Sequence, residues 1–127
     1  MVESLNDLVV DEAELDQRLL TSILAPFARI AKPSGRPAFT PEFSALAEGD
    51  KILVYLLARK AAVRLGLLSD DEGASPKEIA IETGVKYGTV KPSVISLANK
   101  SLVASKDGKY SVPNYAVFQI EGRLARK

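Results

Sequence analysis

The sequence predicts a mainly α-helical protein with one small β-hairpin, and three features of the second half of the chain carry this prediction. A short capped helix, a second amphipathic helix and a hairpin with an Asp-Gly turn follow one another between residues 75 and 113. Apolar residues at helical spacing before and after this stretch add a helix at each end. We therefore expect an N-terminal amphipathic helix and connector over residues 1–41, a central domain over 42–113 and a C-terminal helix over 114–127.

The first short helix begins at a clear capping signal. Ser75 can cap the helix, Pro76 takes the first helical position, where its missing N–H costs nothing, and Glu78 completes a Ser-x-x-Glu capping box. Gly84 follows Ala80 by four residues, where a chain that leaves a helix needs a residue tolerant of positive φ. The sequence thus predicts a helix that ends in a tight turn at Gly84.

The second short helix has one apolar face and one polar face. Val90, Val94 and Leu97 recur at spacings of four and three residues, so they share one side of a helix. Pro92 is unfavourable deep in a helix because it lacks an N–H and clashes with the preceding turn. We therefore start this helix near Thr89, as its cap, with Pro92 in the first turn. The residues away from the apolar face are basic, hydroxylated or aromatic and include no acid: Lys86, Tyr87, Thr89, Lys91, Ser93 and Ser96.

A β-hairpin follows this helix. Residues 102–105 and 109–112 are short runs of β-forming type, and Asp107-Gly108 between them is a strong two-residue turn signal. The spacing of Ala80 and Gly84, the run GVKYGTV from Gly84 and the Asp107-Gly108 hairpin together resemble the winged helix-turn-helix regulators of bacteria and archaea. This resemblance covers roughly residues 50–113, about half of the chain. Its motifs are specific for the fold and weak for the function, because winged helices also serve in protein docking.

The resemblance implies a DNA-binding protein, a dimeric transcriptional regulator that inserts helix 89–100 in the major groove and lays wing 102–113 on the backbone. Short polar side chains of the helix would reach base edges, and lysines beside it would contact phosphates. The candidate DNA-binding residues are Lys86, Tyr87, Thr89, Lys91, Ser93, Ser96, Lys100, Lys106 and Lys109. This face has no arginine for bidentate contact with guanine, so specificity would depend on Lys91, the hydroxyls or DNA shape. The alternative is a winged-helix interaction subunit of a larger assembly, with the acidic first helix as the contact.

Composition and charge narrow the classes of function. The chain has 127 residues, no cysteine and no histidine, which removes disulfides, thiolate chemistry, imidazole bases and nearly every zinc site. No catalytic constellation is visible, so we expect no enzyme, no cofactor and no metal. The net charge is only +1, but residues 1–16 hold six acids and no base, whereas residues 86–109 hold five lysines against one acid. Such a local field matters more to association with nucleic acid than the total charge does.

No apolar run reaches the ~18 residues of a membrane span, and the N-terminus is acidic where a signal peptide is basic. We therefore expect a cytoplasmic protein. Apolar residues predict an amphipathic helix from about Ser4 to Ala25 that bends or stops at Pro26. Its apolar face either packs on the domain or forms a homodimer together with the C-terminal helix. The candidate dimer residues are Leu8, Leu15, Leu19, Ile23, Phe27, Phe118 and Leu124.

Two further segments lie between the N-terminal helix and the capped helix. Residues 32–41 contain three prolines and a glycine and therefore predict a connector. Asp50 is expected to cap the most hydrophobic helix of the chain, which should form the centre of the core. Arg59, Lys60 and Arg64 interrupt its apolar sequence, and we expect them to form a solvent-exposed stripe.

Overall fold

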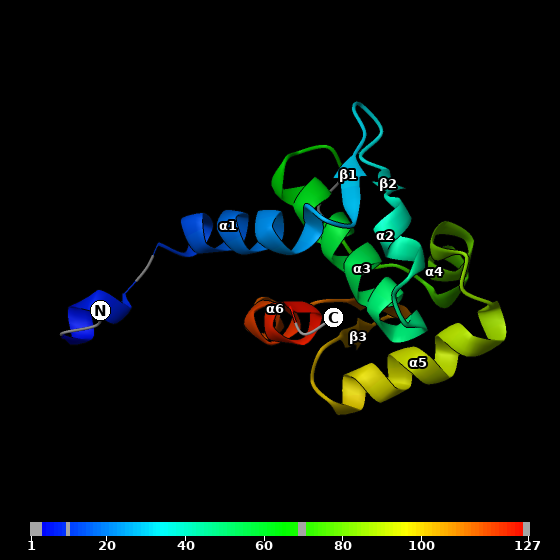
Figure 1. Cartoon of the computed structure of the whole chain (residues 1–127). Coiled ribbons are helices and arrows are strands. Elements are labelled where there is room, and N and C mark those ends of the chain that lie inside the picture. The colour runs from blue at the N-terminus through cyan, green and yellow to red at the C-terminus, as the bar shows by residue number, and fades with distance from the viewer. Residues whose placement is uncertain (1–3, 10, 69–70, 126–127) are drawn as a thin grey trace.

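The structure is a computed structural model that describes residues 4–9, 11–68 and 71–125, with the backbone alone for residues 12–16. As expected, it is mainly helical, but it contains two small antiparallel hairpins instead of one (Figure 1). The elements are η1 (Leu5–Leu8), α1 (Glu12–Leu24), β1 (Ala28–Ile30), β2 (Pro37–Phe39), α2 (Pro41–Ser44), α3 (Glu48–Arg64), α4 (Pro76–Thr83), α5 (Tyr87–Asn99), β3 (Ala104–Lys106), β4 (Lys109–Ser111), η2 (Asn114–Ala116) and α6 (Val117–Ala125).

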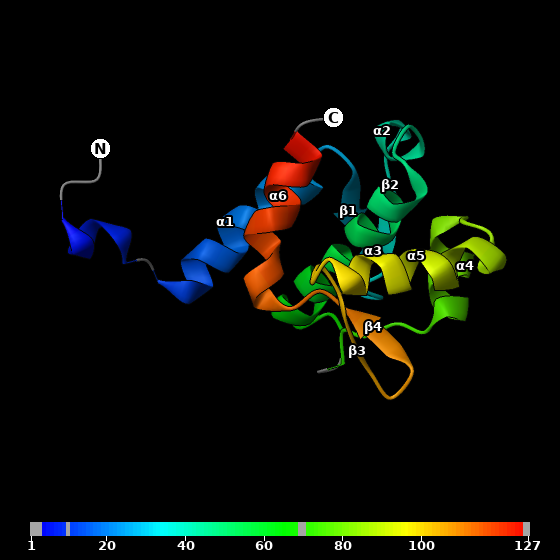
Figure 2. The same cartoon turned by 90° about the horizontal axis from the view of Figure 1, so that it is seen from below.

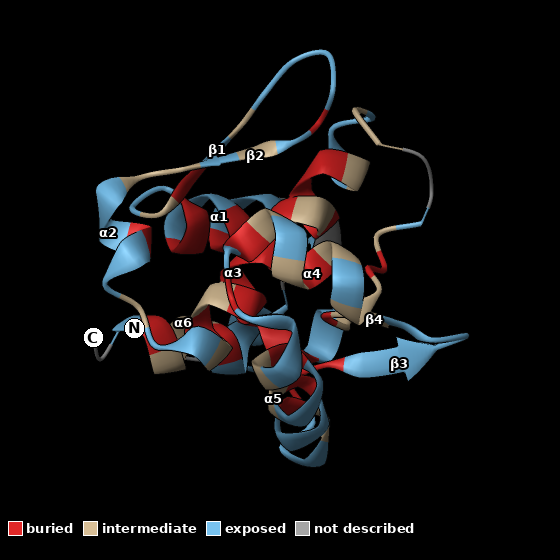
Figure 3. Cartoon of the chain, turned by 90° about the vertical axis from the view of Figure 1, so that its right-hand side faces the viewer, coloured by how far each residue is buried: buried red, intermediate tan, exposed pale blue. Residues whose placement is uncertain are grey.

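Helix α3 forms the centre of the core, as the sequence predicts. It contacts α1, α4, α5, β1, β2 and β4, so nearly every side of it is covered (Figure 3). Ile52 to Ala58 are all buried, which explains why this helix is apolar all round instead of amphipathic. One cluster of buried residues joins α1, α3, α5 and α6, so residues from all three expected segments share a single core.

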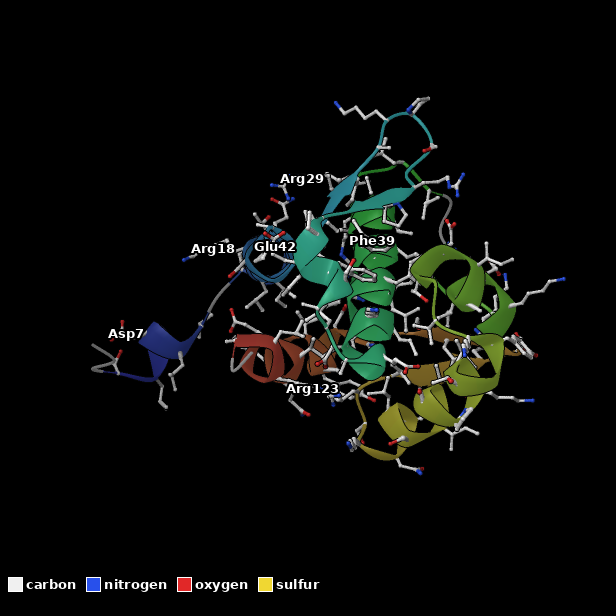
Figure 4. The ribbon with its side chains drawn as sticks, turned by 45° about the vertical axis from the view of Figure 1, so that its right-hand side comes forward. Asp7, Arg18, Arg29, Phe39, Glu42 and Arg123 are labelled. Atoms are coloured by element: carbon white, nitrogen blue, oxygen red, sulfur yellow. The ribbon has the colours of Figure 1, made fainter. Side chains whose placement is uncertain are left out.

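The expected cap of α3 is wrong. The N-cap residue is Ala47, and Asp50 lies within the first turn of the helix with its side chain fully buried. Arg123 of α6 donates from Nε to Asp50 Oδ1 over 2.7 Å. Figure 4 shows Arg123 pointing from α6 toward the N-terminal end of α3. The carboxylate thus joins two helices, and the helix dipole also favours its negative charge at this end of α3.

The N-terminal helix is shorter than predicted and is divided. Val9 has an extended backbone after η1, and the α-helix begins only at Glu12 and ends at Leu24, just before Pro26. Val10 lies outside the described residues. The residues of η1 are exposed, and Figure 1 shows this segment standing apart from the body. The buried side chains of α1 lie in its C-terminal half, which is the part shown to pack on the domain: Leu19, Leu20, Ile23 and Leu24. A short helix is marginal in water without such packing.

The expected connector over residues 32–41 contains regular structure. Strand β2 pairs antiparallel with β1 in the register Ala28↔Phe39 and Ile30↔Pro37, and Pro41 begins the short helix α2. Phe39 stacks on Phe43 of α2 with ring centroids 3.8 Å apart. Pro37 is the first residue of its strand, a position where a missing N–H is tolerated. Only the turn between the strands is a connector.

The capped helix and its turn are confirmed. Glu78 donates its backbone N–H to Ser75 Oγ over 3.2 Å, and Glu78 Oε1 accepts from the Ser75 N–H over 3.3 Å. Gly84 has a φ of +79° and donates its N–H to the Ala80 carbonyl, as a left-handed cap does. This turn leads into α5 after only two further residues.

Helix α5 begins two residues before the expected cap. Lys86 is the N-cap and Tyr87 the first helical residue, so Thr89 is inside the helix and Pro92 lies in its second turn. Without an N–H, Pro92 cannot donate to the carbonyl of Gly88. Gly88 is exposed, so its carbonyl can bond to water, and the proline is tolerated further into the helix than the sequence suggested.

The hairpin after α5 is confirmed at its turn, with strands shorter than expected. Asp107 and Gly108 have φ values of 54° and 78°, the left-handed conformations of a type I′ turn. Lys106 pairs with Lys109 beside this turn, and Tyr110 also bonds twice to Ala74, which lies between α3 and α4. A strand-like segment before α4 thus lies along β4. Figure 2 shows the hairpin projecting beside α5.

The C-terminal segment is helical, as predicted, from Asn114 to Ala125, and its last two residues lie outside the described range. Val117, Ile120 and Leu124 face the core. Within the described part of the chain, no helix is both long enough and apolar enough to cross a membrane.

Candidate nucleic-acid interface

Helix α5 is held by the core on one side and exposed on the others. Val90, Val94 and Leu97 are buried, and the helix packs on α3 and α4 through this face. The tight turn at Gly84 fixes the direction in which α5 leaves α4. Because α3 and α4 support it from behind, α5 presents a rigid outer surface.

The outermost surface of α5 is a stripe that we call the outward stripe. It contains residues at helical spacings of three and four opposite the buried face, and all of them are exposed: Gly88, Lys91, Pro92, Ile95 and Asn99. Only Lys91 and Asn99 carry polar side chains. Lys91 is one of the predicted DNA-binding residues and Ile95 is not, although Ile95 follows Lys91 by four residues and therefore lies beside it on a helix.

The hydroxyl-bearing candidates lie on one flank of α5 and not at its centre. Thr89, Ser93, Ser96 and Lys100 line a shallow hollow of about 430 Å³ together with Gly49 of α3 and Arg123 of α6. Thr89 and Ser93 are half-buried there, whereas Ser96 and Lys100 are exposed. Tyr87 is exposed at the start of the helix. The structure thus brings Thr89, Ser93 and Ser96 together, but it turns two of these three hydroxyl-bearing side chains, Thr89 and Ser93, toward the body of the protein.

Arg123 is a basic residue of this hollow that the sequence analysis did not select. Its Nε is engaged by Asp50, and its Nη2 lies near Gly49. No local pattern indicates this position, because α6 is distant from α5 in the sequence. Only the packing of α6 beside α3 reveals it.

The candidate lysines differ in what surrounds them. Lys86, Lys91, Lys100 and Lys106 are exposed, and no ion pair to any of them is formed by the side chains that the structure describes. Lys109 instead forms an ion pair, because its Nζ donates to Asp71 Oδ2 over 2.9 Å. Four of the five lysines therefore present their charge to solvent.

The Lys109–Asp71 pair changes the ionisation of both groups. The hydrogen bond from Lys109, together with the N–H of Gly73 that Asp71 Oδ1 accepts at 2.9 Å, holds the pKa of Asp71 below its ordinary value. The same carboxylate raises the pKa of Lys109. The positive charge of Lys109 is thus partly neutralised by the loop before α4, and this lysine is a weaker candidate for a phosphate contact than Lys106.

Arg59 and Lys60, two of the four basic residues of α3, are engaged in contacts near the base of the hairpin, contrary to the expected solvent-exposed stripe. Lys60 is only 3 % exposed, and its Nζ donates to Glu72 Oε1 and to the Val112 carbonyl, both over 3.0 Å. Arg59 donates to the carbonyls of Glu72 and Gly73 over 2.9 and 3.1 Å. Arg59 therefore links α3 to the segment before α4, and Lys60 links α3 both to that segment and to Val112, the residue after β4.

Arg64 is exposed, as expected, and donates to Asn114 Oδ1 over 3.0 Å. Arg59 and Lys60 thus donate to acceptors within the protein, so we do not count them among the candidate phosphate contacts. They instead position the hairpin beside α5 (Figure 2).

The candidate dimer residues divide into two groups. Leu19, Ile23 and Leu124 are buried in the core of the single chain, and Phe27 is half-buried against it. These four residues pack on their own domain, which is the alternative to a dimer interface that the sequence left open. Leu8 and Phe118 are exposed, and the side chain of Leu15 lies outside the described residues. Exposed apolar surface thus remains at both ends of the chain, but less of it than the sequence suggested.

Among the described residues, no group of three or more acidic, histidine or cysteine side chains is placed to hold a metal ion. A second hollow of about 500 Å³ lies between α1, β1 and the C-terminal half of α3. Apolar side chains such as Leu20, Leu24 and Leu65 line it, with Arg29 and Arg64 also present. None of the described side chains that line it is a carboxylate.

Comparison of the chain with protein-family models, with curated proteins and with solved structures found no significant match.

Proposed function

We propose that this protein binds double-stranded DNA through a winged helix-turn-helix core, as a transcriptional regulator. In this proposal α5 enters the major groove and the β3–β4 hairpin is the wing that contacts the backbone. The main observation in support of the proposal is the exposed outer side of α5, with exposed lysines on the helix and beside it. The opposite side of α5 packs on α3 and α4.

The order of the elements supports the fold. Helix α3, the strand-like segment at Ala74, helices α4 and α5 and the β3–β4 hairpin follow one another along the chain, and Ala74 pairs with Tyr110 of the hairpin. A tight turn at a positive-φ glycine joins α4 to α5. This is the order of a helix-turn-helix followed by a wing.

The charge distribution supports DNA as the ligand. Lys86, Lys91 and Lys100 are exposed along α5, and Lys106 is exposed beside the turn of the hairpin. A duplex carries one negative charge per ~1.7 Å of its axis, so even a few such lysines give a favourable and salt-dependent interaction. The small net charge of +1 is no obstacle, because η1, in the acidic N-terminal segment, lies on the far side of the molecule from α5 (Figures 1 and 2).

The test is binding to a fluorescein-labelled duplex, followed by anisotropy at several salt concentrations. We expect affinity to fall steeply with salt, and we expect Lys86→Gln with Lys91→Gln to weaken binding and to lower the slope of log K against log salt by roughly one per lysine. Lys32→Gln is the matched control, because Lys32 lies in the β1–β2 turn, at the opposite end of the molecule from α5 (Figure 1). Full binding by the folded double variant would contradict the assignment of α5.

A protein-docking role is the second candidate, and the exposed apolar side chains of Tyr87 and Ile95 favour it. It predicts no salt-dependent binding to DNA and a partner protein that stays bound at high salt. The anisotropy titration therefore separates the two functions, because apolar protein contacts are not weakened by salt as phosphate contacts are.

We further propose that the protein acts as a homodimer. Leu8 and Phe118 are exposed apolar residues from opposite ends of the chain, and among the expected interface residues whose side chains the structure describes they are the exposed ones. One short helix and one hairpin make few contacts with DNA, whereas two half-sites about 34–36 Å apart combine their contacts in one binding event. Light scattering of the protein in solution tests this proposal directly.

A further inference from the structure

The outward stripe of α5 has an unusual chemistry for a surface that reads bases. Gly88 has no side chain, and the side chains of Pro92 and Ile95 can neither donate nor accept a hydrogen bond. Ile95 is 50 % exposed near the middle of the helix, with Lys91 one turn before it and Asn99 one turn after it. The centre of the stripe therefore offers apolar contact where hydrogen bonding would be expected.

The major groove contains one apolar group that such a surface can recognise. Guanine, cytosine and adenine present only donors and acceptors there, whereas thymine adds its C5 methyl group beside the O4 acceptor. An isoleucine side chain against this methyl group removes apolar surface of both partners from water. Against the polar edge of another base it would leave donors or acceptors without partners.

We propose, on the basis of the DNA-binding function above, that Ile95 selects thymine by contact with its C5 methyl group. The occupant of the outward stripe is thus a duplex with thymine opposite the middle of α5. Charge supports this occupant, because Lys91 on α5 and Lys86 and Lys100 at its two ends are exposed, and their ammonium groups attract a polyanion. Lys91 contacts the DNA backbone or a base edge one helical turn away, and Ile95 discriminates thymine from the other bases.

The experiment first selects a preferred duplex from a random library with the wild-type protein. Each thymine of that duplex is then replaced in turn by deoxyuridine, which lacks only the C5 methyl group and keeps the same hydrogen-bonding groups. We expect one or two positions at which this replacement weakens binding about fourfold, which is the effect of burying one methyl group at ~0.8 kcal/mol. The Ile95→Ala variant should bind the two duplexes equally well.

Ile81→Ala is the matched control, because Ile81 is an exposed isoleucine, 69 % accessible, on the neighbouring helix α4. This variant should keep the full discrimination between thymine and deoxyuridine. Ile95 is half-exposed, so its replacement by alanine should leave the fold intact, which circular dichroism and a thermal melt verify.

The outcomes separate the inference from the function on which it rests. If the wild type binds its selected duplex and no deoxyuridine position matters, the inference is wrong and DNA binding stands. If the discrimination persists in Ile95→Ala, another residue contacts the methyl group, and the role of Ile95 is overturned. If the wild type selects no duplex and binds none, the proposed function is refuted together with the inference.

Discussion

Replacing Lys60 by methionine tests the physical argument for how the hairpin is held beside α5. The buried ammonium group donates to Glu72 Oε1 and to the Val112 carbonyl, both over 3.0 Å. Methionine fills a similar volume but donates no hydrogen bond. The variant therefore leaves a mostly buried carboxylate, with a side chain 19 % exposed, and a buried carbonyl without their common donor.

The magnitude follows from these two lost contacts. A hydrogen bond that involves a charged group contributes about 1.5–3 kcal/mol, and removing one partner of a buried ion pair costs about 3–5 kcal/mol. Methionine recovers part of this loss, because the desolvation of the ammonium group is no longer needed. We expect the free energy of unfolding to fall by about 3 kcal/mol, which corresponds to a decrease in Tm of roughly 10 °C for a chain of this size.

The assay is urea denaturation followed by circular dichroism. Lys51→Met is the matched control, since Lys51 lies on the same helix and is only half-buried, and its effect should stay within about 0.5 kcal/mol. The double variant Lys60→Met with Glu72→Gln should lose less stability than the sum of the single changes, because the carboxylate that Lys60 leaves behind is no longer charged. Exchange of the amide hydrogen of Tyr110, which bonds to the Ala74 carbonyl over 2.8 Å, should become faster in Lys60→Met.

One result would refute the reasoning. A loss for Lys60→Met of under 1 kcal/mol, with unchanged exchange at Tyr110, would mean that the ammonium group reaches water in solution. The link between α3, the strand-like segment and β4 would then not hold the hairpin in place.

Three further outcomes are expected. Gly84→Ala should lower the free energy of unfolding by about 1–2 kcal/mol, because Gly84 has a φ of +79° that alanine adopts only with strain. Gly88→Ala, in helix α5, should be neutral or stabilising. Equal effects of the two variants in urea denaturation would contradict the left-handed conformation of Gly84. Asp71→Asn should free Lys109 and make the salt dependence of DNA binding steeper by about one unit, and an unchanged slope would exclude a phosphate contact by Lys109. Since the pKa of Asp71 is lowered by Lys109, the stabilisation from this pair is present above the ordinary pKa of an aspartate and is lost as pH falls through the lowered value, so the stability difference between wild type and Asp71→Asn should vanish in acid. Phe118→Glu should convert a dimer to a monomer in light scattering, and a wild type that is already monomeric would end the dimer proposal.

The features that could be predicted from the sequence depend on residues a few positions apart. The capping box of Ser75 and Glu78, the left-handed conformation of Gly84 and the Asp107-Gly108 turn are all present. Each is decided by hydrogen bonds and steric limits within one turn of chain, so the residue types suffice. The apolar spacing of Val90 and Val94 likewise identified the buried face of α5.

The candidate site was predicted only in part, because the faces of α5 depend on its neighbours. The sequence could show which side of the helix is apolar, and that Ile95 lies beside Lys91 away from that side, but not that Ser93 would turn toward α6. The helix begins at Tyr87 and not at Thr89, and Pro92 is tolerated in its second turn, where Gly88, the residue whose carbonyl lacks the proline's N–H, is exposed.

The roles of the charged residues were decided by contacts between distant parts of the chain. Asp50 and Arg123 are 73 residues apart, and Lys60 and Val112 are 52 residues apart. A lysine or an aspartate on a helix is expected to face water, since burying a charge is costly without a partner. Whether such a partner exists depends on where α6 and β4 pack against α3, and this packing is a property of the whole core that no local pattern of residues contains.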